Sequence, residues 1–379
     1  MKCRVLLLLS MGVLLAVHRS SALPSQTVIT SLQPVIIAGI DRIDNPQGSR
    51  AMLLLEEASS LLSVESNASG SKLLTADGDT PASAFDLIQR STIKHLPYGT
   101  IECFILGESV LKDDLLHYID YWSKDNELRL ISPIFAMRGC SAETALTLVA
   151  QNEAANVLES LNTNSETSTV AHEMEFVQFI EKLCDPTACF TLPCLVVTDD
   201  KSVNALIPNG YALITRGHFT TYLDPIQSSV YHLLTNQPGR FTMQIPVQGT
   251  LATTIVENAH TQVECVFEGD TLRKIILNLE VNSDALDTYG VRNMAANSTM
   301  QAMNKAQEAL LYKQCSALLK LAQENASDFL GLSEHFRLLH PYRWNKVQDD
   351  WPTIFAQTEI ELNVVTHVRH SFDTLMIAD

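Results

Sequence analysis

The spacing of apolar residues along this chain alternates between the pattern of a buried strand and that of an amphipathic helix. A continuous apolar run at residues 34–41 predicts a buried strand. Residues 101–106 have strand composition, residues 111–122 repeat apolar side chains at helical spacing, and residues 128–137 return to strand composition. This order predicts a strand-helix-strand unit in the first half of the chain.

The second half contains a series of short segments of strand composition separated by brief polar or glycine-containing links. These segments are residues 241–247, 252–258, 261–267 and 273–281. They predict an antiparallel sheet, because such short links join antiparallel neighbours. Long helices are expected at about residues 299–324 and 326–340, and a strand is expected after them at residues 358–368.

Local turn and cap signals add boundaries to these elements. Thr80 supplies an N-cap before a proline, so a helix is expected over residues 81–91. Residues 205–222 predict a hairpin that turns either at residues 209–210 or at residues 216–217, both of which end in glycine.

The first residues carry the pattern of an export signal. Lys2 and Arg4 precede an apolar run at residues 5–17, and the small residues 20–22 suit a signal peptidase. The run is shorter than the roughly 20 apolar residues that span a bilayer. Cleavage is therefore the favoured interpretation, and a retained N-terminal anchor is the alternative.

The length of 379 residues exceeds what one hydrophobic core usually serves, so two or three domains are expected. The polar residues 198–202 indicate a boundary between them. We therefore expect a signal peptide at residues 1–22, an N-terminal domain of one or two subdomains at 23–200, and a C-terminal domain at 201–379.

The formal net charge of −17 limits the classes of partner. Such a surface repels the phosphates of nucleic acid, and it does not favour adhesion to anionic lipid through basic patches. Solubility alone is the commoner reason for a charge of this sign and size.

Seven cysteines lie outside the expected leader, so at least one stays unpaired within a monomer. Cys184, Cys189 and Cys194 recur at a five-residue spacing in a segment with prolines, which predicts a loop. Zinc prefers ligand pairs about two to four residues apart. A local disulfide is expected in preference to a metal, and free thiols are the alternative in an anaerobic source.

The search for catalytic motifs ends without a candidate. The chain has no Gly-x-Ser-x-Gly elbow, and Ser109 follows Gly107-Glu108 at a helix start, where capping explains it. Residues 70–72 have the wrong order for a phosphate-binding loop. The many carboxylates cannot be assigned as acid and base without geometry. We therefore expect no catalytic and no cofactor-binding residues.

The histidines do not form a metal-binding pattern. His172 is followed by Glu173 but lacks the second histidine of a metalloprotease motif. His335 and His340 diverge on a predicted helix, and residues 367 and 370 point to opposite faces of a predicted strand. We expect no metal site.

Two tryptophans and two adjacent aspartates are conspicuous near the C-terminus. Residues 349–351, Asp-Asp-Trp, fit a capped turn that packs one aromatic side chain at least as well as they fit a site. Trp344 and Trp351 are either anchors for a partner or core residues, and burial is the commoner fate of a tryptophan beside an apolar helix.

Several blocks in a fixed order resemble the Ger(x)C family of spore germination proteins, the C subunits of germinant receptors. Residues 35–41, Val-Ile-Ile-Ala-Gly-Ile-Asp, resemble the family's first strand after its anchor. The other blocks that are similar to the family are residues 80–85, Gly107-Glu108, Leu115, Ile119 and Asp120, residues 330–334, residues 340–344, Asp350, Trp351, Ile354 and Phe355, and residues 364–370. Together these blocks extend over nearly the whole mature chain.

This resemblance implies a multidomain α+β fold, with a mixed sheet in the N-terminal region and an antiparallel sheet with long helices in the C-terminal region, which agrees with the order of elements above. It also implies a non-enzymatic protein that assembles with two membrane-embedded partners, an A-type subunit with a large soluble domain and a permease-like B-type subunit. It implies an exported protein at the outer face of the spore inner membrane. Members of the family carry an acylated cysteine after the leader, and Leu23 stands at that place here. The export signal is therefore expected without the lipid anchor.

Two other classes of function remain open from the residues alone. A secreted hydrolase that uses an unrecognised carboxylate pair would share the export signal and the acidic composition. A soluble extracytoplasmic ligand-binding protein would also explain the leucine at position 23.

Overall fold

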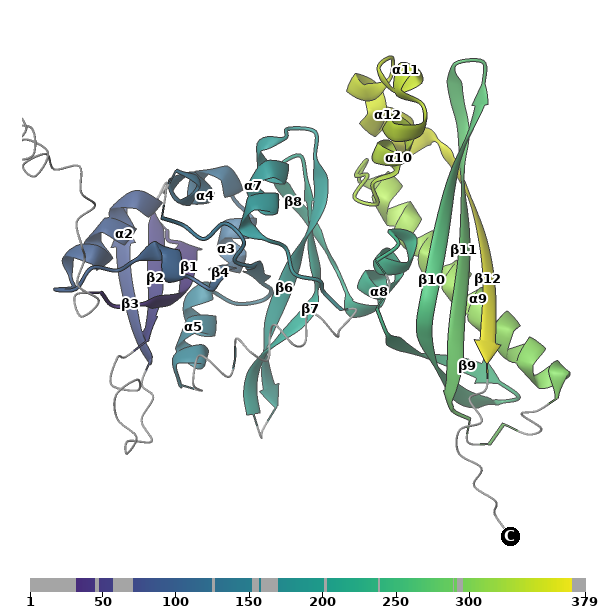
Figure 1. Cartoon of the computed structure of the whole chain (residues 1–379), viewed down its shortest axis with the longest axis horizontal. Coiled ribbons are helices and arrows are strands. Elements are labelled where there is room, and N and C mark those ends of the chain that lie inside the picture. Colours follow the sequence, from purple (N-terminus) through teal and green to yellow (C-terminus); the bar gives the residue numbers. More distant parts are fainter. Residues whose placement is uncertain are drawn as a thin grey trace, which may run out of the picture.

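The chain folds into two domains that lie side by side, each built on its own sheet, with helix α8 (Pro225–Leu234) between them (Figure 1). The computed structural model describes residues 32–44, 48–56, 71–124, 127–151, 157, 170–200, 203–237, 239–288, 290–291 and 296–369. The expected signal peptide and Leu23 lie outside these residues.

The N-terminal domain contains an eight-stranded sheet with strand order β3-β2-β1-β4-β5-β6-β7-β8. The strands are β1 (Val35–Arg42), β2 (Ser49–Glu56), β3 (Ser71–Gly78), β4 (Cys103–Leu106), β5 (Ile134–Met137), β6 (Cys189–Asp200), β7 (Val203–Thr215) and β8 (His218–Leu223). Strands β1, β4, β5 and β6 pair in parallel, and the outer pairs are antiparallel. The mixed sheet predicted for this half is confirmed.

Helices cover both faces of this sheet. They are α2 (Pro81–Arg90), η3 (Tyr98–Thr100), α3 (Glu108–Leu111), α4 (Leu115–Ser123), α5 (Ala142–Gln151) and α7 (Phe176–Cys184). Helices α2, α4 and α7 pack on one face around Phe85, Trp122 and Phe176, whereas α5 packs on the other face. The sheet is therefore buried on both sides, which explains why the predicted strand at residues 34–41 is continuously apolar.

The helix cap and the hairpin expected in this domain both occur in the structure, which also decides between the two possible turns of the hairpin. Thr80 and Ser83 form a reciprocal capping box at the start of α2, as expected from the Thr80-Pro81 pair. The hairpin of β7 and β8 turns at Arg216-Gly217, where both residues have positive φ, and not at residues 209–210.

The C-terminal domain contains a four-stranded sheet with strand order β12-β11-β10-β9. Its elements are β9 (Phe241–Val247), β10 (Thr250–Glu268), β11 (Thr271–Asp287), α9 (Asn297–Glu324), α10 (Leu332–Leu339), α11 (Pro341–Trp344), η4 (Gln348–Asp350), α12 (Trp351–Gln357) and β12 (Glu359–Arg369). Helix α9 runs along one face of the sheet, and α10 to α12 gather at one end of it (Figure 1).

The α+β architecture is confirmed, and two element boundaries in this domain were predicted wrongly. Residues 252–258 and 261–267 belong to the single strand β10, because residues 259 and 260 between them also pair with β11. The strand bulges earlier, where the register shifts between Val256 and Asn258. The helix predicted at residues 326–340 begins only at Leu332, because Ala326 and Gly331 both have positive φ. In addition, β12 joins the otherwise antiparallel sheet in parallel to β11.

The division expected between residues 200 and 201 falls between β6 and β7, which pair with each other in the first sheet. This sheet continues through β8 to Leu223. Strands β7 and β8 thus extend the N-terminal sheet toward the second domain.

Candidate functional site

A buried polar cluster joins the two domains. The backbone N–H of His172 donates to the Tyr211 hydroxyl over 2.6 Å, and the same hydroxyl lies 2.6 Å from Nε2 of His232. Tyr211 belongs to β7 and His232 to α8, so the cluster connects the first sheet to the helix between the domains. Since its oxygen already accepts from His172, the Tyr211 hydroxyl is placed to donate its proton to His232. Burial lowers the pKa of His172 and raises the pKa of Tyr211.

A second polar contact ties the end of β7 to the loop after α9. The Thr220 hydroxyl donates to Oγ1 of Thr215, which in turn donates to Oγ of Ser327, and both distances are 2.8 Å. The next residue, Asp328, accepts from the backbone N–H groups of Leu332 and Ser333 and from Trp351 Nε1 at 2.9, 2.6 and 3.0 Å. Its carboxylate thus holds the start of α10 against α12.

A cleft with two adjoining lobes, of about 760 and 520 Å³, lies beside this junction. Lys182, Asp185 and Cys189 line both lobes from the N-terminal domain, and Tyr231 and Phe329 line both from the opposite side. Because the walls come from both domains, the shape of the cleft depends on how the junction holds the domains together.

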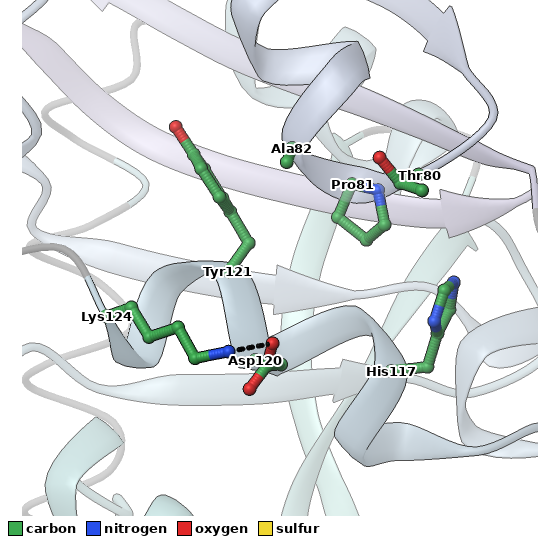
Figure 2. A pocket seen from close by; sticks show the side chains of 7 residues that line it. All are labelled: Thr80, Pro81, Ala82, His117, Asp120, Tyr121 and Lys124. Carbon is green, nitrogen blue, oxygen red and sulfur yellow. Dashed lines mark hydrogen bonds and ion pairs between the residues drawn. The ribbon is translucent and has the colours of Figure 1, made fainter.

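A smaller hollow of about 540 Å³ lies between the start of α2 and helix α4 (Figure 2). Thr80 and Pro81 form one wall, and His117 and Tyr121 extend from α4. Lys124 forms an exposed ion pair with Asp120 at 2.6 Å. A capped helix start and an i,i+4 ion pair are ordinary helix features, so this hollow carries no catalytic arrangement.

Asp41, at the end of the first block of the family resemblance, serves a structural role. Its carboxylate accepts from the backbone N–H groups of Ala142 and Glu143 at 2.9 and 3.0 Å, at the start of α5. Burial, the largest influence, raises the pKa of this carboxyl group. Gly107 permits the close approach, since a Cβ there would lie 1.6 Å from Oδ1 of Asp41.

The residues near the C-terminus that stand out in the sequence divide between core and surface. Trp351 is buried, which agrees with the aromatic packing expected for residues 349–351, while Asp349 and Asp350 are exposed. Trp344 is half-buried against Trp351, with ring centroids 5.3 Å apart. Ser109 was expected to cap a helix, but its hydroxyl accepts from the backbone N–H of Arg42 at 3.1 Å.

The histidines and cysteines of the described residues form no metal-binding group of three or more ligands. His367 lies 3.5 Å from Glu280, and His370 falls outside the described residues. The seven cysteines that the structure describes are free thiols. The loop predicted around residues 184–194 is wrong, since β6 begins at Cys189. Cys194 lies in the core of the first domain and Cys189 packs toward the second, so the expected local disulfide does not form.

Sequence reasoning missed an exposed apolar group at the end of the C-terminal domain. Leu338 and Leu339 on α10 are 65% and 60% exposed, and Tyr342 on α11 is 87% exposed. The signal was present in the sequence, because α10 carries more apolar residues than the two, Leu332 and Phe336, that it buries. Within the described ranges, no helix has both the length and the apolar character needed to cross a bilayer.

Two sequence models of one family match this chain, and together they cover most of the described residues. The sequence model for the "Spore germination protein N-terminal domain" matches residues 25–197, and that for "Spore germination B3/ GerAC like, C-terminal" matches residues 209–372.

Individual relatives agree with these matches. The chain is 20% identical to the spore germination protein GerQC of Bacillus cereus over 79% of this chain and 82% of the relative. It is 22% identical to the spore germination protein YndF of Bacillus subtilis over 69% and 66% of the two chains. The crystal structure of the GerBC protein superimposes with a TM-score of 0.57 and 16% identity over 87% of this chain and 96% of that one, which shows a shared fold. The chain therefore belongs to the Ger(x)C family of germinant-receptor C subunits.

Proposed function

We propose that this protein is a non-catalytic receptor subunit that assembles with A-type and B-type membrane subunits and is needed for nutrient-triggered germination. Its family relationship gives it a role in spore germination and implies association with other germinant-receptor subunits. The proposal adds the identity of the partners, the nutrient trigger and the absence of catalysis.

The observation that carries the proposal is the pair of family matches, one on each domain of the same chain. A domain borrowed for another task would match over one half only. Here both halves match, and the two-domain layout also corresponds to nearly all of the GerBC chain. The presence of both family domains in one chain supports the function of a C subunit.

The buried carboxylates support a structural rather than a chemical role. Asp41 accepts two backbone N–H groups at the start of α5, and Asp328 accepts three donors around α10 and α12. A general acid or base needs an oxygen that is free to exchange a proton with substrate. Asp41 lies at a helix start, and Asp328 lines the larger lobe of the cleft, but the oxygens of both already accept from donors of the protein.

Location is the second part of the proposal. The family relationship supports a place in the spore, where its relatives act in germination. We infer that the leader exports the chain to the outer face of the spore inner membrane and that contact with the membrane subunits, not a lipid, retains it there. The reason is chemical, since acylation requires a cysteine thiol and Leu23 has no nucleophile.

A germination assay tests the function. Spores that lack the protein should fail to respond to a subset of nutrients and should still germinate by routes that need no nutrient. Loss of cortex hydrolysis under every stimulus would contradict the receptor function and would favour the hydrolase alternative.

The anchor is tested separately by fatty-acid labelling and fractionation. The natural protein should remain unlabelled and should leave the membrane fraction when the partner subunits are deleted. The variant Leu23→Cys should become labelled and stay in the membrane without the partners. Labelling of the natural protein would show that residue 23 is not the position at which the family carries its acylated cysteine.

A further inference from the structure

The outer strand of the C-terminal sheet, β9, has an edge whose hydrogen-bonding direction can be derived from its hairpin. Gln248 and Gly249 form the two-residue turn between β9 and β10, and both have positive φ. In such a turn the flanking residues, Val247 and Thr250, exchange backbone hydrogen bonds. Every second residue from Val247 back along β9 therefore forms backbone hydrogen bonds with β10. The backbone N–H and C=O groups of the residues between them point away from β10, toward the open edge of the sheet.

The outward-facing residues are Thr242, Gln244 and Pro246. Proline lacks an N–H and is tolerated in a sheet only where that group would point away from the ladder, so Pro246 independently agrees with this register. The backbone groups of Thr242 and Gln244 have no hydrogen-bond partner among the described residues outside β10. The edge thus presents two consecutive outward-facing residues and then a proline stop.

An apolar groove of about 660 Å³ adjoins this open edge. Thr242 and Gln244 line it from β9, Ile226 and Val230 line it from α8, and Leu310 lines it from α9. Ile226 is 59% exposed, although isoleucine is among the residue types most often buried. The groove therefore combines unpaired backbone groups on one side with apolar side chains on the other.

We propose that this groove binds an extended segment of a partner protein, which adds to the sheet as a strand beside β9. The two outward-facing residues can exchange up to four backbone hydrogen bonds with such a segment. Alternate side chains of the segment would enter the groove between α8 and α9, and the others would face solvent. The partner segment is accordingly about five residues long, with apolar residues at every second position.

A second copy of this chain does not satisfy the same geometry. If two β9 strands paired with each other, the side chains aimed at each groove would be Phe241, Met243 and Ile245. These side chains already pack against the inside of their own domain, where Met243 and Ile245 are buried. Pairing between copies would therefore leave both grooves unfilled. A segment whose side chains are not already packed inside a domain can fill the groove, and a second copy cannot.

The inference rests on the proposed function only for the source of the segment, which would then be another receptor subunit. Binding itself can be measured on the purified full chain with a labelled, end-blocked heptapeptide, Thr-Val-Thr-Val-Thr-Val-Thr. The control peptide replaces each valine with serine. We expect the valine peptide to raise fluorescence anisotropy and to slow hydrogen exchange at Thr242 and Gln244, and the serine peptide to do neither.

Three variants test the two halves of the groove. Gln244→Pro removes an outward N–H that the native sheet does not use, and it should weaken binding of the valine peptide about tenfold. Pro246→Thr restores a third outward N–H and should strengthen binding. Ile226→Asp places a charge in the apolar wall and should weaken binding. Thermal unfolding midpoints equal to that of the natural chain would establish that each variant folds.

The outcomes separate this inference from the proposed function. No binding of the valine peptide, or equal binding by Gln244→Pro and Pro246→Thr, would overturn the inference.

In solubilised spore membranes, the natural chain and Pro246→Thr should retain the membrane subunits better than Gln244→Pro does. Equal retention by all three would leave the assembly in place and reject the groove. Peptide binding without retention of any subunit would support the groove and reject the assembly. Self-association abolished by Gln244→Pro would identify a second copy as the occupant and contradict the proposed partner.

Discussion

The two domains bury their sheets in different ways. Strands β1, β4 and β5 of the N-terminal domain are almost wholly buried, because helices lie on both faces. Strands β10 and β11 of the C-terminal domain alternate between buried and exposed residues over much of their length, because α9 covers one face. The first domain therefore has the character of a scaffold, and the second offers a sheet surface and an edge for contact with partners.

Substituting one large side chain in each domain would test this difference with the largest expected effect. Phe104→Ala on β4 removes a side chain that is 0% exposed, and it should lower the free energy of unfolding by about 4 kcal/mol. Leu251→Ala on β10 removes a side chain that is 61% exposed, and it should change that free energy by less than about 0.5 kcal/mol. Urea unfolding measures both free energies. Similar losses of stability in the two variants would show that the two domains do not differ in how they bury their sheets.

The end of the C-terminal domain depends on a single carboxylate. Asp328→Asn keeps the size of the side chain but replaces one accepting oxygen with an N–H₂ group that cannot pair with the donors around it. We expect a loss of about 2 kcal/mol, because a buried donor stays unsatisfied. Trp351→Phe removes one of those donors together with its need for a partner and is the matched control. An Asp328→Asn protein as stable as the natural chain would show that the carboxylate does not hold α10 and α12.

Removing the Tyr211 hydroxyl would test how strongly the junction couples the two domains. Tyr211→Phe deletes the acceptor for the His172 backbone N–H and the contact with His232, and it should cost about 1 kcal/mol. The loss should also separate the unfolding transitions of the two domains in calorimetry. Thr220→Val, at the rim of the second contact, should have a smaller effect. One unchanged cooperative transition in Tyr211→Phe would argue against a role of this cluster in coupling the domains.

The smallest expected effect is a pH dependence at the same junction. Burial lowers the pKa of His172 in the folded chain below its ordinary value of 6.5, so the unfolded chain binds the proton more readily. Its contribution to stability is therefore fully present above pH 6.5 and is lost as the pH falls toward the folded pKa. His172→Gln should reduce the slope of stability against pH just below the ordinary histidine pKa of about 6.5. Identical slopes in both proteins would show that His172 does not titrate in this range.

Local chemistry made much of the fold predictable. The Thr80 cap, the glycine turns and the apolar runs act between near neighbours in sequence, and the corresponding elements occur in the structure. The prediction divided β10 between Asn258 and Thr261, whereas the structure continues one strand there and places Asn258 and His260 on its open face. Whether a polar pair ends a strand depends on solvent exposure, which the sequence alone does not give.

The contact sites were less predictable because they depend on residues far apart in sequence. Asp328 meets Trp351 and Thr215 meets Ser327 only after the domains have formed. The parallel pairing of β12 with β11 spans α9 to α12, and no local pattern specifies it. Expectations drawn from spacing alone, such as the disulfide among residues 184–194, failed because strand geometry sends neighbouring cysteines to opposite faces.

Hydrogen exchange of the full chain, measured alone and in membrane complexes purified from spores, tests the central comparison most directly. We predict that assembly slows exchange in the C-terminal sheet, above all at Thr242 and Gln244 on β9, and leaves the parallel strands β4 and β5 unchanged. Protection confined to the N-terminal domain, with exchange along β9 unaltered, would contradict the assignment of scaffold and contact roles.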